Sequence, residues 1–121
     1  MSTDSNITVN KIKLSFADVE ISSKQIGDDL FICVSGGERP HIGCTVLAIP
    51  RPSLTGDGSI SATSSVLNVT GHKDEAICRL LAERAAAARN CTVVCTGGFH
   101  MDNITPDQIS ELMNAIGSAS S

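Results

Sequence analysis

The sequence contains no tryptophan and no tyrosine, and Phe16, Phe31 and Phe99 are its only phenylalanines. A hydrophobic core must therefore be built mainly from Ile, Val, Leu, Ala and Cys. Apolar residues make up 41% of the 121-residue chain, which is typical of a compact globular protein rather than a disordered one. We expect residues 1–121 to form a single domain, with flexible ends at 1–6 and 118–121.

The sequence also lacks an excess of basic residues and any long apolar run. Its net charge is -4, whereas a nucleic-acid-binding module normally shows a basic stripe and aromatic side chains for stacking. No apolar run reaches the about 18 residues of a membrane span, and the opening MSTDSNITVNK lacks the features of a signal peptide. We therefore expect no nucleic-acid partner, no membrane insertion and a cytoplasmic location.

The five cysteines are an odd number in apolar surroundings, which does not indicate a disulfide framework and fits a reducing compartment. Cys91 and Cys95 are four apart in an expected strand, so they would share one face. They could form half of a soft-metal site or be two small buried side chains. The absence of any CxxC pair favours buried side chains.

Six segments show strand patterns. The first two alternate apolar and polar residues as half-buried strands do, while LFICVSGG and HIGCTVLAIP are apolar on both faces, which predicts central strands. Local turn residues predict a loop over 51–58. The expected strands are 7–14, 16–25, 30–37, 41–50, 59–71 and 91–98.

Two segments show helical patterns. Apolar residues recur at helical spacing over 72–90. In the second helix Thr105 is an N-cap, Pro106 suits the first position, Gln108 completes a capping box and Gly117 marks the stop. Five strands, a helix, a strand and a helix predict an α+β fold. We expect an antiparallel-dominated sheet of about six strands with two helices packed on one face.

Basic side chains gather at glycine-rich strand ends. His41 in RPHIG, His72 in TGHKDE and His100 in GGFHMD each have a glycine within two residues. Glycine allows close approach of a ligand to the backbone, and strand ends can converge on one rim of a sheet. Arg39 and Arg51 flank one strand and could bind phosphate, although Arg51 alone fits a solvated turn. The stretch GGERPHIG reads locally as a turn between two buried strands.

The segment TGHKDE joins a strand to a helix start, where unsatisfied N–H groups and the dipole favour an anion. Gly71 permits a tight turn, and His72 and Lys73 add positive charge, so a phosphate would suit this place. Asp74 could instead cap the helix and exclude an anion. Local sequence favours the capping interpretation.

Two enzymatic interpretations have weaker support. His100 and Asp102 are two apart and could join His41 in a site for a divalent transition metal. No HExxH or other spaced ligand motif accompanies them. Ser35 lies in VSGGE, which lacks the glycine-x-serine-x-glycine elbow of a hydrolase nucleophile.

Taken together, the segments GDDLFICVSGGERPHIGCTVLA, RPSL, SATSSVLNVTGHKDE and GGFHMDNIT resemble one family. They are similar to the small D-subunit-type, LpdD-like proteins that accompany UbiD-type hydroxyarylic-acid decarboxylases and act as prenylated-flavin chaperones. The resemblance covers residues 24–116. It implies a non-enzymatic protein that binds prenylated FMN, or FMN, and helps a separate decarboxylase to mature. The family is also distantly similar to proteasome-assembly chaperones, which are α+β sandwiches that associate in pairs.

The resemblance carries over a set of residues that match its pattern. Four of them, Pro40, Gly43, Asp74 and Gly98, are taken as pattern positions only. Our hypothesis places Arg39, His72 and Lys73 against the flavin phosphate. The positions expected to bind the cofactor are Gly37, Arg39, His41, Arg51, Gly71, His72, Lys73, His100 and Asp102.

The same hypothesis places His41, His100 and Asp102 nearer the flavin ring system. Because aromatic side chains are scarce, aliphatic walls or a subunit interface would have to cover the ring. Exposed strand edges also lead us to expect a homo-oligomer, a dimer or higher. Two alternatives stay open: an assembly module without a cofactor, and a small metal-dependent enzyme that uses the three histidines.

Overall fold

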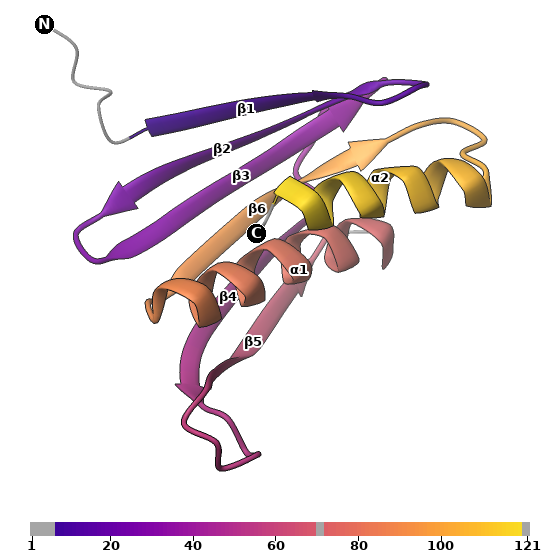
Figure 1. Ribbon diagram of the computed structural model, residues 1–121. Helices are drawn as coiled ribbons and strands as arrows, with labels where there is room; N and C mark the ends of the chain where they lie inside the picture. The colour runs from indigo at the N-terminus through magenta and orange to yellow at the C-terminus, as the bar shows by residue number, and fades with distance from the viewer. Residues whose placement is uncertain (1–6, 70–71, 120–121) are drawn as a thin grey trace, which may run out of the picture.

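The computed structural model describes residues 7–69 and 72–119, apart from the side chains at 72 and 73. These residues form one sheet of six strands with two helices on one of its faces (Figure 1). The α+β class, the strand number and the helix placement that the sequence predicts are confirmed. The elements are β1 (Ile7–Lys13), β2 (Asp18–Ile26), β3 (Asp29–Gly37), β4 (Cys44–Pro52), β5 (Ile60–Asn68), α1 (His72–Arg89), β6 (Val93–His100) and α2 (Pro106–Ala119).

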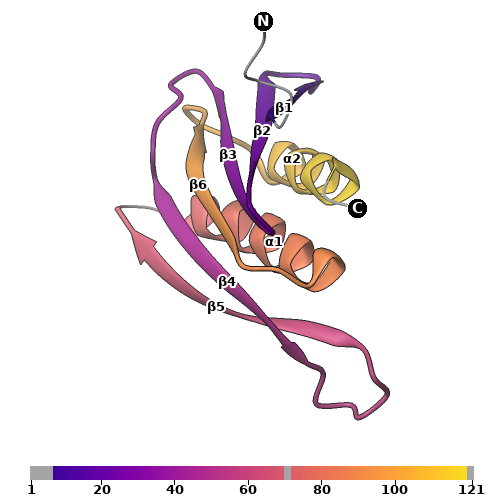
Figure 2. The ribbon, with the colours of Figure 1, turned by 90° about the vertical axis from the view of Figure 1, so that its left-hand side faces the viewer.

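The strand order is β1-β2-β3-β6-β4-β5. Strand β6 lies between β3 and β4, parallel to β3 and antiparallel to β4, and the remaining described pairs are antiparallel. The end of β3, the end of β6 and the start of β4 therefore lie next to one another at one end of the central strands. The β4–β5 hairpin curves away from the helices at its far end (Figure 2). This topology determines which loops can share a site.

The hydrophobic core lies between the helices and one face of the sheet. Ile77 and Leu81 of α1 and Leu112 and Ile116 of α2 are buried there, as their helical spacing predicts. Phe99 of β6 is fully buried and meets the ring of Phe16 edge-on, with centroids 6.0 Å apart. Such an aromatic pair adds about 0.5–1.5 kcal/mol to the burial of its area. The scarce aromatic residues thus serve packing.

The cysteines are core residues rather than metal ligands or disulfides. All five are free thiols; Cys44, Cys78, Cys91 and Cys95 are buried and Cys33 is partly buried. Burial and contact with Cys78 raise the pKa of Cys44 to about 12, and burial raises that of Cys91. A thiol held protonated is a poor nucleophile and metal ligand, so the interpretation of buried small side chains is confirmed.

The opposite face of the sheet, which we call the open face, carries no helix (Figure 2). Register places Phe31, Val94 and Leu47 side by side across β3, β6 and β4. Ile49 and Leu67 belong to the same face of the β4–β5 hairpin, and Leu67 is 77% exposed. An apolar band therefore crosses a surface that no described residue covers.

Several predicted boundaries need correction; β2 covers Asp18–Ile26 rather than 16–25, and β6 covers Val93–His100 rather than 91–98. Helix α2 continues through Gly117 to residue 119, so the predicted stop at this glycine is wrong; the Arg84 side chain binds the Gly117 carbonyl oxygen and holds this turn against α1. Strand β4 starts at 44 rather than 41 and extends to Pro52, into the predicted loop. Beyond Ala48 it pairs with β5 only, so it tolerates proline as an edge strand does.

Candidate functional site

The stretch 38–43 connects β3 to β4 across the end of β6, so GGERPHIG is a crossing connection between non-neighbouring strands. Gly37 precedes it at φ 80°, where an added Cβ would stand 2.1 Å from the His100 carbonyl oxygen. Glu38 donates its backbone N–H to that oxygen at 2.7 Å. Glycine is required here because the connection folds back directly onto β6.

Arg39, His100 and Asp102 form an exposed charged triad at this edge. The Nη2 group of Arg39 donates to Asp102 Oδ1 at 2.9 Å, and Nε2 of His100 lies 2.8 Å from the same oxygen. The Asp102 backbone N–H donates to the Glu38 carboxylate at 2.8 Å, which holds the loop in place. The His100 hydrogen bond, followed by the Arg39 charge, lowers the pKa of Asp102. The Arg39 side chain makes these contacts through Nη2, and it is 68% exposed.

A second pair, His41 and Asp74, lies beside this triad. Nε2 of His41 is 3.0 Å from Asp74 Oδ2, and its Nδ1 is 3.0 Å from the carbonyl oxygen of Arg39. Both ring nitrogens therefore face oxygen atoms. The Asp74 side chain is 6% exposed and the His41 side chain 36%. The rings of His41 and His100 are 6.3 Å apart, centroid to centroid.

Asp74 links the start of α1 to the sheet. Its Oδ1 accepts the N–H of Phe99 at 2.9 Å, just beyond the point where β4 leaves β6. Among the described residues the hydrogen-bond partners of its carboxylate are His41 and Phe99, so the capping that local sequence favours is not seen there. Gly43 and Gly98 leave room for the carboxylate, since a Cβ at either would stand within 2.0 Å or 3.0 Å of Oδ2. The two glycines are thus explained by a contact distant in sequence.

We call Arg39, His41, Asp74, His100 and Asp102 the rim cluster. Next to it lies a hollow of about 310 Å³ on the open face, which Gly37 and Pro40 also line. Its other walls come from β1, β2 and β3.

Lys11 and Lys13 stand two apart on the same face of β1 and line this hollow together with Ser35. The ammonium group of Lys11 lies 3.9 Å from the Glu20 carboxylate, a long and exposed ion pair. Sequence reasoning assigned both lysines to the polar side of a strand and missed them as site residues. Two lysines at i and i+2 were the available signal, but the pairing of β1 with β2 was needed to place them.

The structure brings together five of the nine predicted cofactor-binding residues: Gly37, Arg39, His41, His100 and Asp102. Lys73 and His72 begin α1, directly before Asp74, but their side chains lie outside the described residues, as does Gly71 entirely. Within the described part, no group of three or more His, Cys, Asp or Glu is placed to hold a metal ion.

Arg51 is not brought to the rim cluster. It lies seven residues beyond Cys44 along β4, a separation of about 23 Å in an extended strand. Its Nε donates to Thr63 Oγ1 at 2.8 Å and its Nη1 to the Pro52 carbonyl oxygen at 3.2 Å. Within one chain, Arg51 therefore belongs to the far end of the β4–β5 hairpin.

Comparisons with known proteins agree with this description. The family model for the prenylated flavin chaperone LpdD-like domain matches residues 14–120. No curated protein matches the chain. A crystal structure of a chaperone complex for yeast 20S proteasome assembly aligns over 95% of this chain and 98% of its own, with a TM-score of 0.51 and 8% identity. At that identity the likeness concerns the fold. Among the described helices, none is both long and apolar enough to cross a membrane.

Proposed function

Because this chain belongs to the prenylated flavin chaperone LpdD-like family, we propose that it binds prenylated FMN and supports the maturation of a UbiD-type decarboxylase. Family membership confirms the prediction of a chaperone rather than an enzyme. The cofactor, the decarboxylase partner and the binding residues are our proposal. The free cysteines support a cytoplasmic location for it.

The observation that carries the proposal is the meeting of the rim cluster with the 310 Å³ hollow. A flavin phosphate is an anion, and Arg39 offers it the guanidinium group of an exposed side chain. Lys11 and Lys13 add two cations on the other side of the hollow. Asp18 and Glu20 also line the hollow, and Lys11 lies 3.9 Å from Glu20, so a phosphate would bind mainly through Lys13 and Arg39. The contribution of His72 and Lys73 to phosphate binding stays a prediction.

The flavin ring would lie over the glycine-rich end of β3. The side chain that β3 contributes to the hollow is the small Ser35, so a flat ring system can approach this end of the strand closely. His100 lies at the edge of this surface as a hydrogen-bond partner for ring oxygens or nitrogens, and the His41 ring, 6.3 Å away, offers a surface for packing. The hollow is at the lower end of the size range of cofactor sites, about 300–1,000 Å³. A second copy of the chain would cover the part of the flavin ring that this hollow leaves exposed.

Equilibrium dialysis against FMN and prenylated FMN tests the proposal. The chain has no Trp or Tyr, so flavin absorbance is read on a nearly blank background. We expect uptake by the native chain and at least tenfold weaker uptake by the Arg39→Ala, His100→Ala double variant, whose altered side chains are exposed. Arg51→Ala removes an arginine from the far end of β4 and should leave uptake unchanged. Failure of the native chain to take up either flavin overturns the proposal.

A homo-oligomer is the second part of the proposal. The apolar band of Phe31, Val94 and Leu47 on the open face supports it, since association would remove this band from water. A protein-assembly module without cofactor is the alternative function. It predicts that the rim variants change the sedimentation of the protein and not its flavin content.

A further inference from the structure

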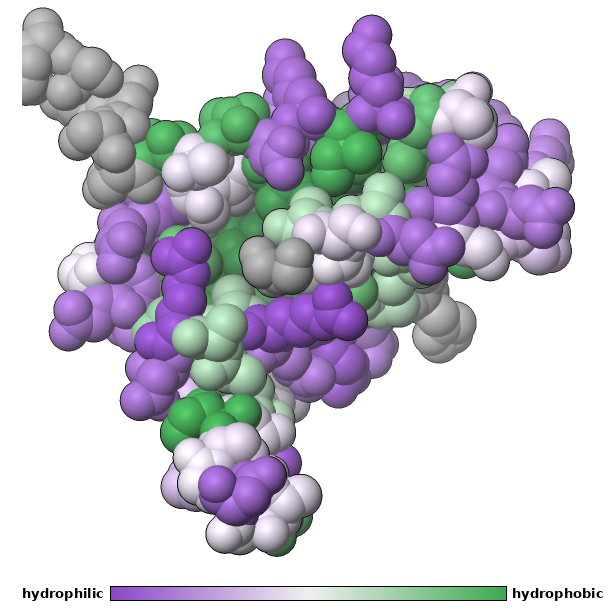
Figure 3. All heavy atoms as spheres, viewed as in Figure 1, coloured by the Kyte–Doolittle hydropathy of each residue, from purple (hydrophilic) through white to green (hydrophobic). Residues whose placement is uncertain are grey.

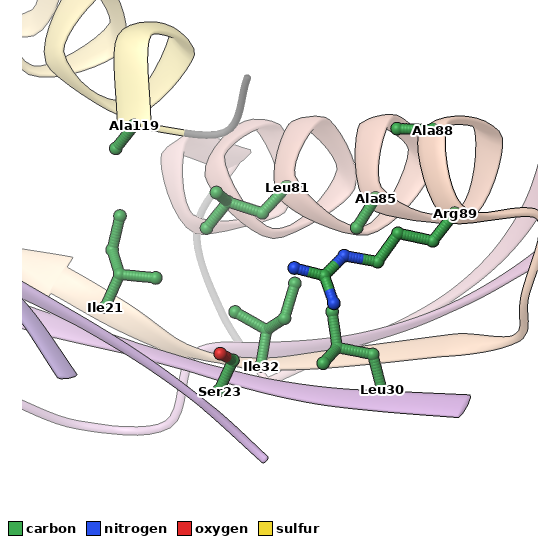
Figure 4. A pocket seen from close by; sticks show the side chains of 9 residues that line it. All are labelled: Ile21, Ser23, Leu30, Ile32, Leu81, Ala85, Ala88, Arg89 and Ala119. Atoms are coloured by element: carbon green, nitrogen blue, oxygen red, sulfur yellow. The ribbon is translucent and has the colours of Figure 1, made fainter. Parts of the chain in front are cut away.

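A second hollow, which we call the helix-end pocket, lies between the sheet and the last turns of α1 and α2. Its volume is about 170 Å³, and its walls include Ile21, Leu30, Ile32, Leu81, Ala85 and Arg89 (Figure 4). Leu30 and Ile32 face the helices near the start of β3, whereas the rim cluster lies at the end of β3. The proposed flavin site does not use this pocket.

Small side chains keep the pocket open. Ala85 projects only a methyl group from α1 toward this space, while Ile21 and Ile32 form the opposite wall on the sheet (Figure 4). Figure 4 shows the helix above and the strands below, with the apolar side chains converging between them. Figure 3 shows apolar surface between the helices and the β1–β2 hairpin. The space is therefore a slot between two layers, suited to a flat apolar group.

Arg89 provides one positive charge at this slot. Arg89 is exposed, and its guanidinium extends along the sheet side of α1 toward Leu30 and Ile32 (Figure 4). Arginine stays charged, and within the described part of the chain this one has no ion-pair partner. Asp29, the first residue of β3, accepts the backbone N–H of Thr92 at 3.0 Å. Arg89 thus presents unused donors beside an apolar wall.

From this pairing of slot and cation we propose that the helix-end pocket binds a small carboxylic acid with a ring-sized apolar body. A cavity of about 150 Å³ lined by aliphatic side chains holds a benzene molecule, so this pocket has the right size for a single six-membered ring. The guanidinium fork matches the two oxygens of a carboxylate. A benzoate-like anion would place its ring between Ala85 and Ile32 and its carboxylate at Arg89.

Titration of the full chain with benzoate, followed by ¹H–¹⁵N NMR, tests the assignment. For nine heavy atoms we expect a Kd of about 1 mM, with the largest shifts at residues 85, 88 and 89. Benzamide has the same shape without the charge and should bind at least tenfold more weakly. Equal binding of benzoate and benzamide, or shifts centred elsewhere, would overturn the proposal.

Two variants separate the charge from the space. Arg89→Gln should weaken benzoate binding at least tenfold, and Ala85→Leu should abolish it by filling the slot. Lys24→Gln is the matched control, since it removes one positive charge from β2 on the open face and should change nothing. Thermal melting verifies that each variant folds. Unchanged benzoate affinity in Arg89→Gln contradicts the assignment, and flavin uptake by this variant should equal that of the native chain.

Discussion

At the scale of single residues, the rim cluster depends on Asp74. Its buried carboxylate joins three segments far apart in sequence: the start of α1, the end of β6 and the 38–43 connection. Asp74 is a poor candidate for ligand binding because both of its oxygens are engaged. Its role is to fix His41, whose ring is exposed enough to meet a ligand. The sequence predicted Arg39, His41, His100 and Asp102 as site residues and favoured Asp74 as a helix cap, since capping is the local use of an acid at that position.

Gly43→Ala should disrupt this arrangement. The new Cβ would stand 2.0 Å from Asp74 Oδ2, so the carboxylate or the connection must move. We expect a loss of about 2–4 kcal/mol in the free energy of unfolding, the range for overpacking combined with a lost buried hydrogen bond. Urea denaturation measures it. Stability equal to that of the native chain would show that the carboxylate relocates freely and that the site is not rigid.

Asp102 allows a prediction about pH. Its pKa is lowered, first by His100 and then by Arg39, so its folded-state pKa lies below that of the unfolded chain. The stability that it contributes is present above the unfolded value of about 3.9 and is lost as pH falls through the folded value. NMR titration of the Asp102 carboxyl should show that His100→Ala and Arg39→Ala each raise its pKa toward the unfolded value. An unchanged pKa in both variants would show that the triad does not form in solution.

At the scale of secondary-structure elements, local patterns located all eight segments, because periodicity and capping are encoded in neighbouring residues. The α2 start is an example: Gln108 donates its N–H to Thr105 Oγ1 at 3.1 Å and accepts the Thr105 N–H at 2.9 Å, as the capping box requires. The predicted end of α2 was wrong because a glycine near the end of a helical pattern normally indicates that the helix stops there. The contact from Arg84 on α1, which local sequence does not reveal, keeps the turn helical.

Gly117→Ala should therefore stabilise the protein. Gly117 is within α2, and an added Cβ would make an ordinary contact, 3.5 Å from Arg84 Nη1. Alanine is favoured over glycine in a helix by about 1 kcal/mol, which raises the Tm by about 4 °C for a domain of this size. Gly27→Ala is the opposite control, because its φ of 60° disfavours alanine. A lower Tm for Gly117→Ala would show that this turn is not helical in solution.

At the scale of the whole molecule, the arrangement of the sheet was the least predictable part. No local signal inserts β6 between β3 and β4, because that placement depends on packing of α1 against the finished sheet. The insertion of β6 brings His100 beside Arg39. Because of it, residues 38–43 cross the end of β6 instead of forming a tight turn between neighbouring strands. The same topology leaves Arg51 at the far end of β4. The family resemblance placed Arg39, His100 and Arg51 in one site. The strand order shows that Arg51 lies apart from the other two.

The open face leads to the last prediction, on assembly. Leu47 of β4 is paired with Val94 of β6 on one side and with Ser65 of β5 on the other. Its side chain is 38% exposed. If two copies pair through this face, Leu47→Glu places a charge in the interface and should convert the oligomer to a monomer, since an unpaired buried charge costs several kcal/mol. Leu54→Glu is the matched control, in a loop where the side chain is 91% exposed. Analytical ultracentrifugation measures both variants, and a native chain that sediments as a monomer, or a Leu47→Glu oligomer of native size, would exclude the open face as the interface.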